Sequence, residues 1–475
     1  MAFSASLRRL TTLIGLLGVL FSSLTGCSSG SGGVTPNPLP TGDEPNMGRG
    51  ANGIDNLADP GARDVCRANA AVSGRAKWTV LIYMNAANDL QPDSLTNMAQ
   101  IASIGSSPDV NIVVQWKQAA CANCGSPSFV ETRRYRVTPH SSADVASIQR
   151  GVTSVLDNDL LAPPPAPFYN SGTKQADMGD YRVLNDFVKW GSSTYPADHL
   201  AVVLWNHGAG WKPTRTAGGV RPPRFRAFSE DDDTRNEIQT TQIPVALSGT
   251  SQPIDDLIFD CSLMQMIEVA YEVRNSAKLL VGSEESPPGS GYPYDLWLSD
   301  LKTGGAGANP CALGRSIVNT FVSYYRNNFN YNNITQSVID LTKMQNVADK
   351  LDAFASQLRL HTSIESTALQ VSRTTAQRYD YPENKDLADY ADLVRTKATS
   401  QPLKDSATSL LSALRGGVTG SIIYNGFGAF GQDKSYGQAI YIQQPSDFNP
   451  RYYDISLSKP GGAPNWAKFL TEQRQ

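Results

Sequence analysis

The chain of 475 residues has little excess of charge and few residues suited to acid–base chemistry near neutral pH. Its formal net charge is −3, with 41 basic and 44 acidic residues mixed along the sequence. A nucleic-acid partner or a basic membrane-binding face would need clustered positive charge, so the composition argues against both. There are only four histidines, at positions 140, 199, 207 and 361.

Cysteine is also scarce, and its number is uneven. Of the six cysteines, five remain once Cys27 in the N-terminal segment is set aside, so at least one thiol is expected to be unpaired. Cys121 and Cys124 form CANC, but no second ligand pair of suitable spacing accompanies them. This pattern argues against a zinc site and favours a local disulfide or a redox-inert loop.

The only long apolar stretch lies at the N-terminus. Arg8 and Arg9 precede it, it runs from Leu10 to Leu20, and LTGC ends it at Cys27. A charged region, an apolar region and a small-residue site are typical of an export signal, and the stretch is too short to span a membrane comfortably. LTGC followed by SSGSGG resembles a bacterial lipobox, which implies cleavage before Cys27 and lipid on its thiol. The alternative is a plain secretory signal with an incidental cysteine.

These features divide the chain into four expected parts. They are a lipoprotein signal peptide (residues 1–26), a lipidated flexible tether (27–75), one domain (76–445) and a C-terminal extension (446–475). The Gly-, Ser- and Pro-rich composition after Cys27 is the reason for expecting a tether. The sequence therefore predicts an exported lipoprotein, anchored to a bacterial membrane on its periplasmic or cell-surface side.

Within the domain, apolar runs alternate with helix-compatible segments. The predicted strands include WTVLIYM, VNIVVQW, HLAVVLW, IDDLIFD and KLLVG, and YRVLNDFVKW is an amphipathic helix. Such alternation predicts an α/β fold with a mostly parallel sheet, whose ligand site lies beyond the carboxyl ends of the strands. The polar residues at or just past those ends are Asn85, Asn88, Asp89, Asn206, His207, Asp260, Cys261, Ser262, Ser283, Glu284 and Glu285.

Several of these blocks together resemble the clostripain family of cysteine peptidases. They are WTVLIYMNAANDL, DMGDYRVLNDFVKW, YPADHLAVVLWNHGAGW, DCSLMQMIEVAYEV, LLVGSEESPPGSGYPY and SYGQAIYIQQP, in the order the family has them. The resemblance implies a caspase-like α/β/α sandwich, peptide or protein substrates and a histidine–cysteine dyad. His207, in WNHGAGW, matches the histidine. A lone histidine is otherwise more often structural.

The nucleophile position departs from the family pattern. The family has D-A-C-L-M where this chain has DCSLM, so without a gap Cys261 matches the alanine and Ser262 the nucleophile. One residue turns a side chain to the opposite face of a strand, so the Cys261 thiol should tend to point away from His207. Three alternatives follow: a bulged strand end with Cys261 as nucleophile, Ser262 as a weaker nucleophile, or a site without chemistry.

The resemblance also concerns substrate binding and regulation. Asp260 matches one acidic residue of the pocket for a basic side chain, whereas Ser290 replaces the other, which puts basic specificity in doubt. Residues 212–250 correspond to the family's activation segment and read as a long surface loop. The acidic run at 231–233 could hold calcium, as some relatives require, or could be a solvated loop. No other cofactor or metal is expected.

The leading hypothesis is a clostripain-type cysteine endopeptidase anchored as a lipoprotein. The alternative is an inactive relative that serves as a surface module for binding peptides or proteins. The register of DCSLM separates the two.

Overall fold

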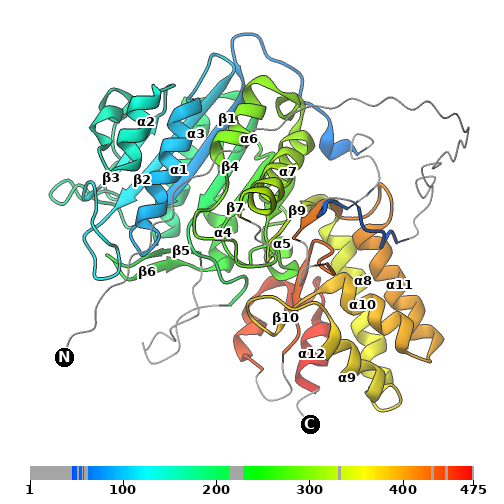
Figure 1. Ribbon diagram of the computed structural model, residues 1–475. Coiled ribbons are helices and arrows are strands. Elements are labelled where there is room, and N and C mark those ends of the chain that lie inside the picture. Colours follow the sequence, from blue (N-terminus) through cyan, green and yellow to red (C-terminus); the bar gives the residue numbers. More distant parts are fainter. Residues whose placement is uncertain are drawn as a thin grey trace, which may run out of the picture. The chain divides into compact units, whose positions relative to one another are not determined.

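The computed structural model describes residues 45–50, 53–55, 57, 63–212, 228–329, 333–428, 433–443 and 448–472. Its centre is an eight-stranded sheet with the order β11-β9-β8-β7-β4-β1-β2-β3 (Figure 1). The strands of this sheet are β1 (Ala76–Asn85), β2 (Val110–Gln118), β3 (Glu131–Arg136), β4 (Ala197–Trp205), β7 (Asp256–Asp260), β8 (Leu279–Gly282), β9 (Thr335–Asp340) and β11 (Ile422–Phe427). Two small sheets pair β5 (Phe228–Asp231) with β6 (Asn236–Ile238) and β10 (Asn384–Asp386) with β12 (Ala439–Tyr441).

The five central strands are parallel, and antiparallel strands flank them on both sides. β8, β7, β4, β1 and β2 pair in parallel, whereas β9, β11 and β3 join in antiparallel register. The apolar runs WTVLIYM and HLAVVLW explain this arrangement, because strands buried on both faces read as continuous hydrophobic stretches. The predicted mostly parallel sheet is confirmed.

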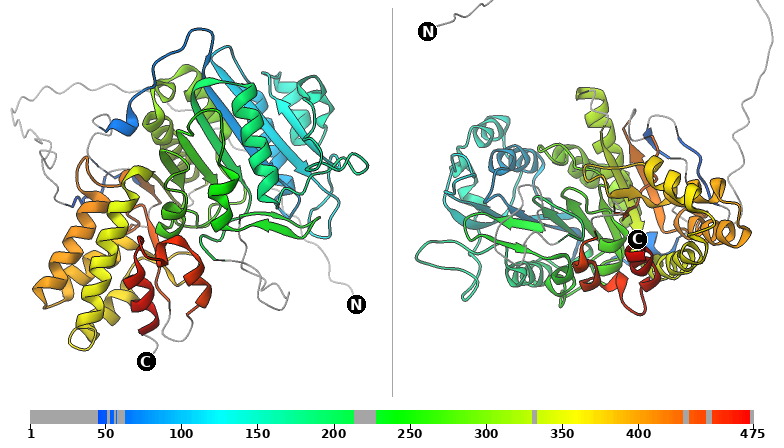
Figure 2. Two further views of the ribbon diagram at one scale, coloured as in Figure 1. Left: turned by 180° about the vertical axis from the view of Figure 1, so that it is seen from behind. Right: turned by 90° about the horizontal axis from the view of Figure 1, so that it is seen from below.

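Helices cover both faces of the sheet. Their bounds are α1 (Gln91–Ile104), α2 (Ser142–Gln149), α3 (Tyr181–Thr194), α4 (Ile243–Ala246), α5 (Ile267–Glu272), α6 (Tyr294–Thr303), α7 (Pro310–Phe329), α8 (Met344–His361), α9 (Ser366–Thr375), α10 (Leu387–Lys397), α11 (Gln401–Arg415) and α12 (Pro464–Glu472). α1, α6 and α7 lie in front of the sheet in Figure 1, and α3 lies on the other face, seen in Figure 2. This is the caspase-like α/β/α sandwich that the resemblance implied.

Side chains alternate along the strands, so the residues on the two faces of the sheet belong to two separate hydrophobic clusters. Leu81, Val202 and Leu257 belong to the cluster that includes the apolar face of α3. Val80 and Ile258 belong to the cluster on the opposite face, with α1, α6 and α7. The face on which a strand residue lies therefore follows from its parity, which matters at the end of β7.

The predicted C-terminal extension is part of the folded domain. α12 packs beside α8, and Trp466 and Phe469 are buried there. Arg359 of α8 forms an ion pair with Glu472, with Arg359 Nη2 2.6 Å from Glu472 Oε1. Apolar residues three and four positions apart in NWAKFLTE make the amphipathic face that the domain covers.

Part of the predicted tether is also packed on the domain. The side chain of Asp55 is buried and accepts hydrogen bonds from Arg49 and Arg415, with Arg415 Nη2 2.9 Å from Asp55 Oδ2. A disulfide joins Cys66 to Cys311 on α7, and a second joins Cys121 to Cys124, as one of the two readings of CANC predicted. Cys27 lies outside the described residues. Composition suggested a flexible segment because it does not reveal such pairings.

The predicted surface loop 212–250 is largely ordered structure. Residues 228–246 form β5, β6 and α4, and Phe228, Ser229 and Asp231 are fully buried. Residues 213–227 lie outside the described part. The polar sequence FSEDDDTRNE concealed this hairpin, because the burial of Glu230, Asp231 and Glu237 cannot be read from their residue types.

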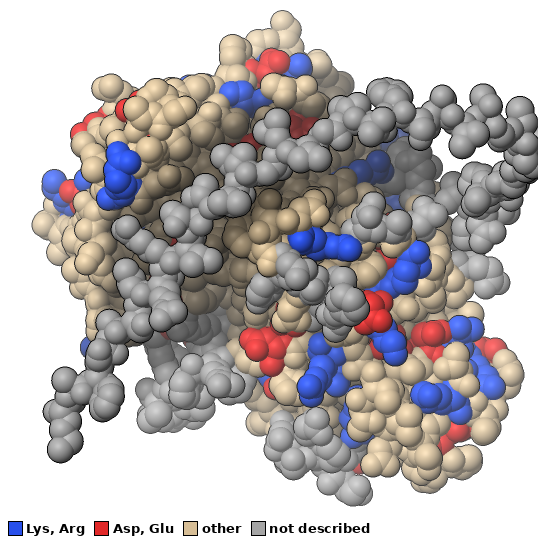
Figure 3. Space-filling view, viewed as in Figure 1, with Lys and Arg blue, Asp and Glu red and all other residues tan. Residues whose placement is uncertain are grey.

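The charged residues on the face shown in Figure 3 are mixed in sign and lie mostly over the C-terminal helices. This agrees with the even mixture of charge along the sequence. Among the described residues, no helix has the length and apolar character needed to cross a membrane.

Candidate functional site

A pocket of about 230 Å³ lies beyond the carboxyl ends of β4 and β7. This is the edge at which parallel α/β sheets bind ligands. The structure brings together five of the residues singled out in the sequence, Asn206, His207, Asp260, Cys261 and Ser262. The remaining residues around the pocket are Leu90, Trp205, Pro287, Pro288, Gly289 and Gly291.

His207 lies in the turn after β4, directly against the segment that follows β7. A Cβ at Gly208 would lie 2.4 Å from the carbonyl oxygen of Ser262, closer than real contacts allow, so only glycine fits there. The imidazole is partly exposed, and its Nε2 lies 2.6 Å from Asp89 Oδ1. Asp89 was among the residues predicted at strand ends, although nothing in the sequence paired it with His207.

Cys261 is next to the pocket, but its thiol is directed into the core. Cys261 continues the alternation of Leu257 and Phe259 and belongs to the same buried cluster. The pairing of β4 with β7 is continuous to Asp260, with no bulge that would rotate the next residue. Cys261 Sγ donates a hydrogen bond to the carbonyl oxygen of Leu204 at 2.9 Å.

The environment of this thiol opposes ionisation. Cys261 is 1% exposed, and burial, with a smaller contribution from the charge of Asp260, raises its pKa well above the ordinary value. The thiolate is the nucleophilic form of cysteine, so a thiol held protonated in an apolar core is unreactive. Cys261 is also the one cysteine outside a disulfide among the described residues.

Ser262 is half-buried at the pocket, one residue further along the chain. Among the described contacts, its hydroxyl makes no hydrogen bond with His207. The next residue, Leu263, has a left-handed backbone with φ of 63°, and helix α5 begins only at Ile267. The chain therefore turns against the His207–Gly208 segment before helix α5 begins.

Asp260 points to the opposite side of the sheet from Cys261, as strand alternation requires. Its Oδ2 accepts hydrogen bonds from Tyr292 N at 3.2 Å and from the Tyr294 hydroxyl at 2.9 Å. Burial raises the pKa of Asp260 to about 7, and these two hydrogen bonds oppose the rise. Ser290 is exposed and does not line the pocket, although its neighbours Gly289 and Gly291 do.

Other residues predicted at the strand ends support the pocket without lining it. Asn85 and Asn88 are buried and donate hydrogen bonds to the carbonyl oxygen of Glu230 at 3.1 and 2.9 Å. Ser283, Glu284 and Glu285 are buried away from the pocket wall. Sequence reasoning found the correct edge of the sheet but could not separate lining residues from supporting ones.

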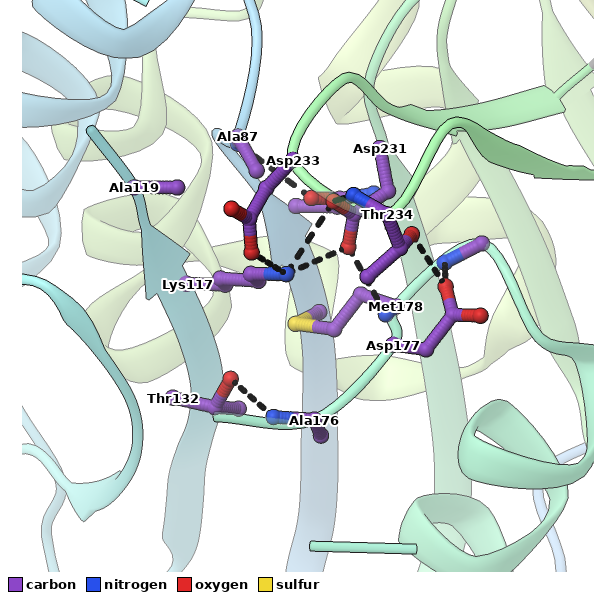
Figure 4. Close-up of polar contacts among 12 residues, drawn as sticks. Ala87, Lys117, Ala119, Thr132, Ala176, Asp177, Met178, Asp231, Asp233 and Thr234 are labelled. Carbon is purple, nitrogen blue, oxygen red and sulfur yellow. Dashed lines mark hydrogen bonds and ion pairs between the residues drawn. The ribbon is translucent and has the colours of Figure 1, made fainter. Parts of the chain in front are cut away.

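The acidic run 231–233 faces an internal cation. The ammonium of Lys117, on β2, lies 2.8 Å from Asp231 Oδ2 and 3.1 Å from Asp233 Oδ2 (Figure 4). Lys117 and Asp231 are fully buried. In the described part of the chain, no group of three or more His, Cys, Asp or Glu residues is arranged to hold a metal ion.

Comparison with known proteins identifies relatives of one kind. The sequence model of the clostripain family (peptidase C11) matches residues 83–470. Clostripain of Hathewaya histolytica is 26% identical over 245 residues, which are 49% of this chain and 44% of that protein. The alignment thus spans less than half the length of this curated relative.

Two solved structures share the fold. An inactive zymogen C11 protease from Parabacteroides distasonis has a TM-score of 0.55 at 19% identity, over 84% of this chain and 99% of that one. A secreted C11 cysteine protease from Bacteroides thetaiotaomicron, in complex with an irreversible peptide inhibitor, has a TM-score of 0.54 at 18% identity, with the same coverage. At these identities the likeness is one of architecture.

Proposed function

The chain belongs to the clostripain family of cysteine peptidases, and we propose that it binds peptide or protein segments in the family's pocket without thiol catalysis. One observation carries this proposal, the burial of the Cys261 thiol against Leu204. A thiol directed into the core cannot attack a peptide carbonyl in the pocket. The residue that takes the family's nucleophile position is Ser262.

The histidine is also arranged differently from a working dyad. A serine needs a base hydrogen-bonded to its hydroxyl to become a nucleophile. His207 Nε2 instead lies beside Asp89 Oδ1, and no described hydrogen bond joins His207 to Ser262. These contacts favour a site that holds a peptide over one that cleaves it.

The second candidate is an endopeptidase that uses Ser262. The pairing of His207 with Asp89, next to a serine at the same pocket, has the composition of a Ser-His-Asp set. This candidate requires one His207 ring nitrogen to bind the Ser262 hydroxyl while the other binds Asp89. Cys261 has no role in this candidate.

Asp260 gives the proposed ligand its chemistry. No lysine or arginine forms an ion pair with its carboxylate among the described contacts, and the pocket reaches it. A lysine or arginine side chain of the bound peptide would supply the missing charge.

The resemblance of LTGC to a lipobox adds a location to the proposal: lipid on Cys27 would hold the protein at a membrane.

A substitution that restores the family register tests the proposal. The wild type, Ser262→Cys and Cys261→Ala are incubated with casein and with a thiol-reactive peptide probe that carries lysine. We expect no cleavage and no label on the wild type or Cys261→Ala, and labelling of the Ser262→Cys variant at position 262. Reversible binding of a fluorescent lysyl peptide to the wild type, followed by anisotropy, is the positive result.

Two outcomes would overturn the proposal. Labelling of the wild type at Cys261, lost in Cys261→Ala, would restore the cysteine peptidase. Cleavage of casein that is lost in both Ser262→Ala and Asp89→Asn, with labelling by a fluorophosphonate, would establish the serine endopeptidase. For the anchor, mass spectrometry of the N-terminal peptide should find a lipid on Cys27, and Cys27→Ala should move the protein to the soluble fraction.

A further inference from the structure

The hairpin formed by β5 and β6 is fixed by a buried ion pair. In Figure 4 the side chain of Lys117 extends from β2 toward the carboxylates of Asp231 and Asp233. The carboxylate of Asp231 also accepts hydrogen bonds from the main-chain N–H of Thr234 and of Met178, at 3.1 and 3.0 Å. One fully buried carboxylate therefore joins three segments of the chain, with Lys117 supplying the balancing charge.

The backbone of strand β5 is strained at Ser229, two residues before Asp231. Ser229 is fully buried with φ of 54°, in the left-handed region that is strained for a non-glycine residue. Its hydroxyl donates to the Met178 carbonyl at 2.8 Å and accepts from Asn85 Nδ2 at 3.1 Å. Such a conformation persists only where surrounding contacts hold it, and such sites tend to be functional.

The contact from β5 to the histidine passes through one side-chain amide. Asn206 Oδ1 accepts hydrogen bonds from Glu230 N at 2.9 Å and from His207 N at 2.7 Å. Asn206 Nδ2 donates to the carbonyl oxygen of Asn85 at 2.6 Å. Glu230 precedes Asp231 directly, so two residues of β5 connect the Lys117 ion pair to the histidine turn.

We propose that Lys117 is a positioning residue for His207, acting through Asp231, the Glu230 main chain and the Asn206 side chain. Lys117 makes no described contact with the pocket, so its influence is entirely indirect. Removal of its ammonium leaves the Asp231 carboxylate buried without a cation, a strongly unfavourable state. β5 then shifts to hydrate that carboxylate, and Asn206 loses the partner that fixes its orientation.

The test compares Lys117→Met with Lys77→Met by native-state hydrogen exchange. Lys77 forms an exposed ion pair with Asp109 on the same sheet, at 2.9 Å, and is the matched control. The amides of Val80 and Leu81 in β1 report global unfolding, and in Lys117→Met the amides of Glu230 and His207 should accelerate about 100-fold more than these two. In Lys77→Met, all four amides should exchange as in the wild type.

The imidazole NMR signals of the folded protein provide a second measurement, because a loss of global stability alone does not change their chemical shifts. The ring signals of His207 should shift in Lys117→Met, while those of His140, His199 and His361 stay in place. Asp231→Asn, which keeps the Asp233 partner of Lys117, should give a smaller, about tenfold, acceleration at the Glu230 and His207 amides. The Asp231→Asn variant replaces Lys117→Met in the test if Lys117→Met fails to fold.

The result that overturns the inference is equally specific. If Glu230 exchanges faster in the variants while the His207 amide and ring signals remain unchanged, the hairpin does not position the histidine. If exchange of all four amides accelerated equally in Lys117→Met, Lys117 would stabilise the whole fold and would not specifically position His207. Neither readout depends on peptide binding, so failure here is distinguishable from failure of the proposed function.

Discussion

Two buried carboxylates at the same edge of the sheet are treated in opposite ways. Asp231, at the end of β5, is paired with the Lys117 ammonium, which is itself fully buried. Asp260, at the end of β7, accepts hydrogen bonds from the Tyr292 main-chain N–H and the Tyr294 hydroxyl. Burial raises the pKa of both carboxyl groups, that of Asp260 to about 7, and Lys117 opposes the rise only at Asp231. The molecule supplies a cation to the first carboxylate and leaves the second open to the pocket.

This difference assigns a structural role to Asp231 and a ligand-binding role to Asp260. A carboxylate with an internal counter-ion is saturated and serves to hold chain segments together. A carboxylate that titrates near neutrality beside a cavity is the kind of perturbed group found at functional sites. The hairpin at Asp231 is therefore interpreted as scaffold, and the pocket at Asp260 as the place for a cationic ligand.

The largest change in stability is expected when Lys117, the counter-ion of Asp231, is replaced. Lys117→Met should lower the free energy of unfolding by about 3–5 kcal/mol, because it leaves a buried carboxylate unpaired. Chemical denaturation followed by tryptophan fluorescence measures this change. Lys77→Met, which breaks an exposed pair, should change it by about 0–1 kcal/mol. Equal effects of the two variants would contradict the role assigned to Lys117.

The opposite result is expected for the carboxylate that has no cation. Since the folded-state pKa of Asp260 is raised to about 7, folding retains a proton that the unfolded chain releases near pH 4, and stability falls as the pH rises from 4 to 7. Asp260→Asn removes this loss and should stabilise the protein at pH 8 by about 1–3 kcal/mol. Thermal unfolding at pH 5 and pH 8 checks this, and a destabilised variant at pH 8 would refute it.

Ligand binding should follow the same titration. Between pH 6 and pH 8 the ionised fraction of a group with pKa about 7 rises about tenfold, so the affinity for a lysyl peptide should rise by the same factor. Anisotropy titrations at the two pH values measure it, with a norleucine peptide as the matched neutral ligand. The pH dependence should vanish in Asp260→Asn; if it persists there, another group binds the cation.

The smallest effect is expected at Cys261. Cys261→Ala removes one sulfur from the core and should cost about 1 kcal/mol of stability while leaving peptide affinity unchanged. Parallel denaturation and anisotropy experiments check both halves of this expectation. A clear loss of affinity would mean that the thiol contributes to the pocket.

The sequence predicted the sheet because its strands are long apolar runs, and it predicted the pocket because polar residues recur where those runs end. It also predicted the direction of the Cys261 thiol, since the alternation of a strand depends only on parity. Three features could not be found in this way. They are the Lys117 ion pair, the contact of His207 with Asp89 and the docking of Asp55 on Arg415.

Each of these missed contacts joins residues far apart in the chain. Lys117 and Asp231 are separated by 114 positions, and His207 and Asp89 by 118. No local pattern encodes such a pair, and a buried charge reads in the sequence like a solvated one. For the same reason FSEDDD was interpreted as a surface loop, although the burial of Glu230 and Asp231 makes it part of the support for the pocket.

Alkylation of native protein tests the account most directly, because its central claim is that the thiol of DCSLM faces the core and Ser262 faces the pocket. Wild type and Ser262→Cys are treated with iodoacetamide under native conditions, and the modified residue is identified by mass spectrometry. The account predicts that Cys261 is modified only after unfolding, whereas the thiol introduced by Ser262→Cys reacts in the folded state and is protected by a lysyl peptide. Rapid modification of Cys261 in the folded wild type, blocked by the same peptide, would contradict it.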